Sequence, residues 1–144
     1  NYIDIAKVKP DVFNHNLETV PRIYKQIRPG SNYIESLKLL REVKEFDPSI
    51  FTKSGIMVGL GEDYTEILEV LKDMKDSNID FVTIGQYLQP SIHHEKVHKF
   101  YSPDEFKSLY NVCLKLGFKM ISSSPMTRSS YHADEDFEKL KKVV

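Results

Sequence analysis

The sequence predicts an α/β fold built on parallel β-strands. Segments with strand-like and helix-like hydrophobic patterns alternate along the chain, in the order strand, helix, strand, helix, strand, helix, strand. The apolar start of residues 81–90 is nearly continuous, which is typical of a strand covered on both faces of its sheet. Because crossover connections between parallel strands have one hand, the carboxyl ends of the strands should share one edge. We therefore expect binding residues at that edge.

The composition is that of an ordinary globular chain. Of 144 residues, 40% are hydrophobic and 28% are charged, and the 20 basic residues nearly balance the 21 acidic ones. This balance gives no field that would attract a nucleic acid, so we expect no such partner. The sequence contains no run of about eighteen apolar residues, which is the length needed to span a membrane. The single cysteine, Cys113, excludes an intrachain disulfide and fits a reducing compartment.

The first predicted strand begins near residue 10 and ends in the polar run 14–19. If the strand persisted, alternation would place Val12, Asn14, Asn16 and Glu18 on one face. Amide and carboxylate groups aligned at a strand end can grip a polar ligand. The same residue types also form turns, and taken alone the run favours a turn.

Two helical segments precede the second strand. Residues 20–27 are stopped by the proline and glycine at 29–30, and the next helix stops at residues 47–48. The apolar residues of that second helix have helical spacing: Tyr33, Leu37, Leu40, Val43 or Lys44, and Phe46.

The second strand, within residues 52–62, is apolar and contains three glycines that let a ligand or a neighbouring backbone come close. It carries neither of the glycine-rich phosphate-binding motifs. Lys53 either lines a polar cavity or points outward at the start of the strand, and its spacing favours the outward orientation.

Two further helices have clear starting signals. Asp63 and Glu66 form a capping-box pattern, and Ser102 and Glu105 form another. Gly117 should end the last helix. The inward positions of that helix are Phe106, Leu109, Tyr110 and Cys113, so we interpret the cysteine as a core residue.

Polar residues cluster after the third and fourth strands. Residues 91–98 include three histidines and a glutamate, but their spacing is not that of a zinc site, which favours a structural or surface role. The apolar run 118–121 is followed by a polar, serine-rich loop, residues 122–134. Such hydroxyls usually bond nearby backbone. The loop's position at a strand end nevertheless makes it our candidate for the chemistry.

Six runs of the sequence together resemble lipoyl synthase. Residues 14–19 and 59–62 also resemble biotin synthase, whereas the Gly-Gln-Tyr-Leu-Gln-Pro run at 85–90 and the Arg-Ser-Ser-Tyr run at 128–131 favour lipoyl synthase. The resemblance covers essentially the whole chain, in order. The runs are 11–20, 28–33, 53–55, 59–62, 85–94 and 128–134.

The resemblance implies a radical S-adenosylmethionine enzyme in the cytoplasm, or in the mitochondrial matrix of a eukaryote. This chain would be the C-terminal part of a partial (β/α)6 TIM-like barrel, with later βα units in residues 1–121 and a C-terminal segment in 122–144. Such a sulfurtransferase uses two 4Fe-4S clusters and S-adenosylmethionine to insert sulfur at C6 and C8 of an octanoyl chain. The octanoyl carrier is a lipoyl carrier domain or the glycine cleavage H protein, and ferredoxin or flavodoxin donates electrons.

The resemblance also implies roles for particular residues. Ser130 maps onto the serine that ligates the auxiliary 4Fe-4S cluster, and Arg128 belongs to the same catalytic run. Asn16 and Glu18 suit the two ribose hydroxyls of S-adenosylmethionine, because an amide oxygen and a carboxylate each accept from a hydroxyl. The residues expected to bind the cofactor are Asn14, Asn16, Glu18, Arg28, Lys53, Gly59, Glu62 and Gln89.

The cysteine motifs that hold both clusters in this family are absent, since Cys113 is the only cysteine. We therefore expect the chain to be the later part of a longer polypeptide and to be inactive alone. Two alternatives stay open: a biotin-synthase-like radical enzyme fragment, and a non-catalytic α/β binding module.

Overall fold

The computed structural model describes residues 12–127. Within this range the chain forms an α/β fold with a four-stranded parallel sheet in the order β1-β2-β3-β4, which confirms the predicted class. The strands are β1 (Val12–Asn14), β2 (Phe51–Val58), β3 (Phe81–Gln86) and β4 (Met120–Ser123). The helices are η1 (Pro21–Ile23), α2 (Tyr24–Ile27), α3 (Tyr33–Phe46), α4 (Tyr64–Asp76) and α5 (Pro103–Leu116).

The strand register aligns side chains across the sheet. Gly55 of β2 lies opposite Thr83 of β3, and Thr83 lies opposite Ser122 of β4. Because alternate residues of a strand point to opposite faces, these three positions share one face of the sheet. Residues at the opposite parity, such as Val58 and Ile84, are buried in the hydrophobic core.

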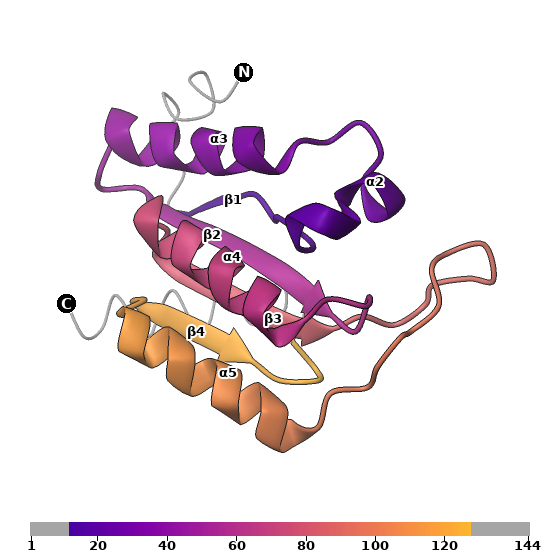
Figure 1. Ribbon diagram of the computed structural model, residues 1–144. Coiled ribbons are helices and arrows are strands. Elements are labelled where there is room, and N and C mark those ends of the chain that lie inside the picture. The colour runs from indigo at the N-terminus through magenta and orange to yellow at the C-terminus, as the bar shows by residue number, and fades with distance from the viewer. Residues whose placement is uncertain (1–11, 128–144) are drawn as a thin grey trace.

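The core lies between the sheet and the helices. Figure 1 shows α4 across the sheet, with α3 and α5 on either side of it. The apolar stripes of these helices are buried, as at Leu40, Leu71 and Leu109, which have no exposed surface. Burying each such side chain contributes about 1.5 to 3 kcal/mol. None of the helices within residues 12–127 is long and apolar enough to cross a membrane.

The ends of α5 follow local chemistry. The Ser102 hydroxyl accepts a hydrogen bond from the Glu105 N–H at 3.1 Å, and the Glu105 carboxylate accepts one from the Ser102 N–H at 3.0 Å. The helix ends at Gly117, whose φ of 90° suits a residue without a Cβ. The predicted start and end of this helix are therefore confirmed.

The predicted inward position of Tyr110 is wrong, and Phe46, which has the helical spacing of a buried residue, is exposed. Tyr110 is 38% exposed, because Phe106, Leu109 and Cys113 form the buried stripe of α5 and Tyr110 lies at the rim of that stripe. Phe46 is 46% exposed because it is the last residue of α3.

Strand ends differ from the sequence prediction by a few residues. β3 stops at Gln86, before the predicted end at residue 90, since the chain then leaves the sheet. In Figure 1 the connection from β3 to α5 extends well away from the sheet. β4 continues to Ser123, two residues beyond the predicted end of that strand.

Candidate functional site

A cavity of about 390 Å³ lies at the carboxyl edge of the sheet. It is formed by residues that follow β1, by residues of the carboxyl-terminal half of β2, by residues within and just after β3, and by the turn after β4. The prediction that strand ends share one opening therefore holds for those segments. The lining consists of Asn16, Glu18, Gly55, Ile56, Met57, Thr83, Gly85, Gln86, Leu88 and Thr127.

Asn16 supplies an unsatisfied acceptor to this site. Its side-chain oxygen Oδ1 is buried and has no hydrogen-bond partner among the residues that the structure describes. Leaving a buried polar atom unpaired costs about 1 to 3 kcal/mol. A ligand that donates a hydrogen bond to Asn16 would remove that cost.

Glu18 reaches the cavity through an unusual backbone conformation. β1 stops at Asn14, which is exposed, so the simple alternation of a strand does not persist. Glu18 has a φ of 77°, and its backbone returns to β2: its N–H donates to the Gly55 carbonyl at 3.0 Å, and its carbonyl accepts from the Met57 N–H at 2.9 Å. This return places Glu18 beside Asn16 in the cavity wall.

Gly55 makes room for this arrangement. A Cβ at residue 55 would lie 2.0 Å from the Thr83 hydroxyl oxygen and 3.4 Å from Asn16 Oδ1. Any side chain here would displace Thr83 and would come into van der Waals contact with Asn16. The predicted space beside this glycine is thus filled by polar groups of the protein itself, from Thr83 and Asn16.

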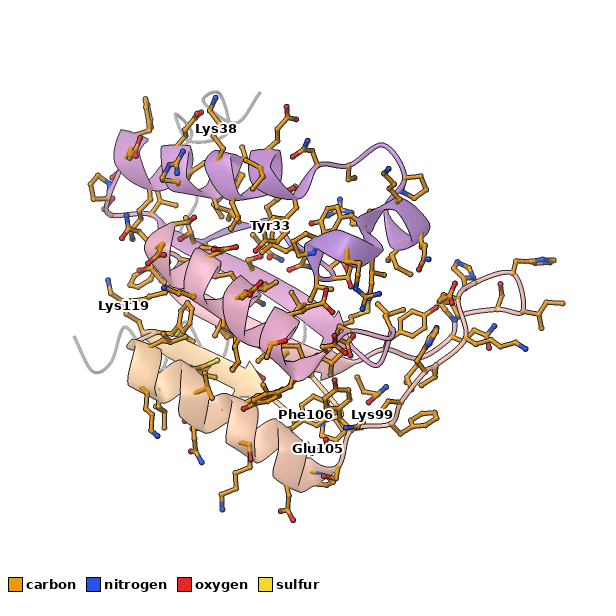
Figure 2. The ribbon with its side chains drawn as sticks, viewed as in Figure 1. Tyr33, Lys38, Lys99, Glu105, Phe106 and Lys119 are labelled. Atoms are coloured by element: carbon orange, nitrogen blue, oxygen red, sulfur yellow. The ribbon has the colours of Figure 1, made fainter. Side chains whose placement is uncertain are left out.

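Gln86 lines the cavity, but its amide is used by the protein. Its Oε1 accepts from the Tyr101 N–H at 2.9 Å, and its Nε2 donates to the Lys99 carbonyl at 3.0 Å. These bonds tie the end of β3 to the chain just before α5, where Lys99 also pairs with Glu105 at 2.6 Å (Figure 2). Gln86 therefore fixes the connection that leaves the sheet.

The described part of the serine-rich loop is a turn that satisfies itself. The Thr127 hydroxyl lies 3.0 Å from the Ser122 hydroxyl and 2.9 Å from that of Ser124. Ser123 donates to the Phe106 carbonyl at 2.8 Å. These contacts match the interpretation in which hydroxyls bond each other and the backbone. Arg128 and Ser130 lie outside the described residues.

Glu62 does not line the cavity as the structure describes it. Its carboxylate accepts from the N–H groups of Gly59 and Leu60, each at 3.0 Å, and from the Tyr101 hydroxyl at 2.8 Å. Burial and this carboxylate raise the pKa of Tyr101. The sequence could not reveal this role, because Tyr101 is 39 residues away.

Other predicted cofactor-binding residues also contact the protein itself. Arg28 donates to the Asn16 carbonyl at 2.8 Å. Gln89 donates to the His94 carbonyl at 2.9 Å, and the Gly59 carbonyl accepts from the His98 N–H at 2.8 Å. Of the predicted residues within 12–127, Asn16 and Glu18 are the pair that the cavity brings together.

The expected outward orientation of Lys53 is wrong. Lys53 is only 1% exposed, and its Nζ lies 4.8 Å from the centre of the Phe81 ring. The strand register explains this burial, because it places Lys53 between Asn14 of β1 and Phe81 of β3. The aromatic face partly offsets the cost of burying the ammonium group.

The histidines bond neighbouring side chains. His98 Nε2 lies 2.9 Å from Glu95 Oε1, and His94 Nδ1 lies 2.8 Å from the Ser91 hydroxyl. Burial, together with the charge of Arg28, lowers the pKa of His15. Between residues 12 and 127 no group of three or more His, Cys, Asp or Glu side chains is placed to hold a metal ion.

Cys113 lies in the core, as predicted, with no exposed surface. Burial raises the pKa of its thiol to about 12. The thiol is therefore protonated at neutral pH, and neither a nucleophile nor a cluster ligand is expected from it.

The fold and the cavity together define a parallel α/β protein with an acceptor-rich pocket at the carboxyl edge of its sheet, the usual place for a ligand in this class. No protein-family model matches the sequence.

Proposed function

We propose that this chain supplies the later strands of a radical S-adenosylmethionine enzyme of the lipoyl synthase type, built on a partial (β/α)6 barrel. Two independent features support the proposal. The sequence runs resemble that family in order along the chain, and Asn16 and Glu18, from the first of those runs, line one cavity.

The buried, unpartnered oxygen of Asn16 carries the proposal. Asn16 and Glu18 line the same wall and each carries a side-chain oxygen acceptor, so the pair suits a ligand with two neighbouring hydroxyl donors. The ribose of S-adenosylmethionine has such a pair. Met57 and Leu88 add apolar surface to the lining, which suits the faces of a purine ring.

The described residues do not fit an iron-sulfur cluster, because Cys113 is buried and is the only cysteine of the chain. Cysteine ligands for both clusters would come from a part of the polypeptide outside this sequence. By resemblance, Ser130 is the ligand that this chain would add to the auxiliary cluster. When bound, the clusters supply the reducing electron and the two sulfur atoms.

Substitution of Glu18 tests the ribose assignment. Glu18→Ala should weaken binding of S-adenosylmethionine by about 1 to 3 kcal/mol, because a hydrogen bond to a charged group is lost. Titration calorimetry measures this change. Glu69→Ala, which removes an exposed carboxylate from α4, is the matched control and should leave affinity unchanged.

The ligand itself provides the second arm of this experiment. Adenosine and 2′,3′-dideoxyadenosine should differ in affinity for the unmodified chain, and that difference should shrink in Glu18→Ala. If the two nucleosides bind equally well to the unmodified chain and to Glu18→Ala, the ribose does not contact Glu18 and the assignment is wrong.

The reaction is tested by product formation in the complete enzyme. Ser130→Ala should abolish conversion of an octanoylated carrier domain to its lipoyl form, since the auxiliary cluster would lose a ligand. Ser49→Ala, an exposed serine beside Asp47, should retain the activity. Mass spectrometry of the intact carrier reports the product. If the unmodified enzyme forms no lipoyl group, the biotin-synthase-like and non-catalytic alternatives are favoured.

A further inference from the structure

The segment that follows β1 is held by side chains as well as by the sheet. Glu18 has a left-handed backbone, which costs a residue with a side chain about 1 to 3 kcal/mol unless its surroundings enforce it. The Gly55 carbonyl and the Met57 N–H bind the backbone of Glu18 from one side. The peptide groups just before Glu18 need other partners, because β1 has already ended at Asn14.

Three side chains provide those partners. Arg28 Nη1 donates to the Asn16 carbonyl at 2.8 Å, and the Tyr24 hydroxyl donates to the Leu17 carbonyl. The Ser54 hydroxyl accepts from the Leu17 N–H at 3.2 Å. Tyr24 and Ser54 are buried, which protects their bonds from exchange with water.

Arg28 acts on the residue that carries the unpartnered acceptor. Its guanidinium binds the main chain of Asn16, a cavity-lining residue whose side-chain Oδ1 is buried without a partner among the described residues. Arg28 itself is outside the cavity lining as described between residues 12 and 127. A charged donor on a backbone carbonyl makes a stronger bond than a neutral one.

We propose that Arg28 is a positioning residue: by clamping the Asn16 carbonyl it fixes the 16–18 backbone, so that Asn16 and Glu18 line one cavity. Tyr24 and Ser54 complete the clamp. The clamp is a property of the protein alone, and only the identity of its ligand rests on the proposed function.

Hydrogen exchange of single amides tests the clamp without a ligand. Arg28→Met should speed exchange of the Glu18 and Met57 amides about tenfold or more, relative to the Asp80 amide, which donates to the Thr52 carbonyl at the other end of the sheet. Arg28→Lys keeps one charged donor and should give an intermediate result. Arg41→Met, which removes an exposed arginine paired with Glu45, is the matched control.

Ligand affinity supplies the second readout. In Arg28→Met the dissociation constant for S-adenosylmethionine should rise about tenfold, with partial recovery in Arg28→Lys. If Arg28→Met accelerates exchange of the Glu18, Met57 and Asp80 amides equally, Arg28 only stabilises the whole fold and the proposal is wrong. The proposal is also wrong if the Glu18 and Met57 amides exchange no faster in Arg28→Met than in Arg41→Met. If the unmodified chain does not bind S-adenosylmethionine, the proposed function fails, while the exchange comparison still decides the clamp.

Discussion

Gly59→Ala should lower the free energy of unfolding by about 3 to 5 kcal/mol, because two penalties coincide at this residue. Gly59 has a φ of 107°, a region that residues with a Cβ rarely adopt. A Cβ there would also lie 2.4 Å from Gln86 Nε2 and 2.5 Å from the Lys99 carbonyl oxygen. Urea denaturation monitored by circular dichroism measures the loss.

Gly30→Ala is the matched control for this experiment. Gly30 has a similar φ of 83°, but a Cβ at that position would have no atom within 4 Å. Gly30→Ala should therefore lower the free energy of unfolding only by the backbone penalty of about 1 to 2 kcal/mol. If the two variants lose the same stability, the close contact with the chain near Lys99 does not contribute.

The Gly59 contact also shows where sequence reasoning is limited. The glycines after β2 were interpreted as space for a ligand or for a neighbouring backbone, and at Gly59 the neighbour is the protein's own chain near Lys99. That chain lies 40 residues further along, so spacing around Gly59 could not reveal it. Glu62 was predicted to bind a cofactor, yet it bonds Tyr101 from the same distant segment.

What the sequence predicted well depends on local chemistry. The hydroxyl of Ser102 and the backbone freedom of Gly117 define the two ends of α5, and both residues carry local signals that can be recognised in the sequence. The order of strands and helices follows from alternating periodicity, and parallel pairing follows from that order. The burial of Lys53 could not be predicted in this way, because it depends on which residues lie opposite it in β1 and β3.

The candidate site was predictable only in part, for the same reason. Alternation along residues 12–18 suggested that Asn16 and Glu18 share a face, and they do share a cavity wall. The structure reaches that result differently, by a left-handed residue and by clamps from Arg28 and Tyr24. A local pattern identified these two cavity-lining residues, whereas their support comes from contacts between separate segments.

Asp80→Ala should destabilise the opposite end of the sheet by about 3 to 5 kcal/mol, because it removes the carboxylate that pairs with the largely buried Lys44 ammonium and the acceptor of the Thr52 N–H. The Asp80 side chain is 5% exposed, and its Oδ2 accepts from Lys44 Nζ at 2.7 Å and from the Thr52 N–H at 2.9 Å. Lys44 is itself only 14% exposed, so water cannot fully replace the carboxylate. Urea denaturation gives the change in unfolding free energy.

Lys119→Ala separates the buried part of this network from its exposed part. Lys119 Nζ lies 3.3 Å from Asp80 Oδ1, but its side chain is 57% exposed and lies at the outer end of the sheet, away from Lys99 (Figure 2). An exposed ion pair contributes about 0 to 1 kcal/mol, so this variant should be nearly as stable as the unmodified chain. Asp80→Asn keeps an acceptor for the Thr52 N–H, so its loss of unfolding free energy should lie between those of Asp80→Ala and Lys119→Ala. Equal losses in Asp80→Ala and Lys119→Ala would mean that the network acts through surface charge rather than through the buried bonds to Lys44 and Thr52.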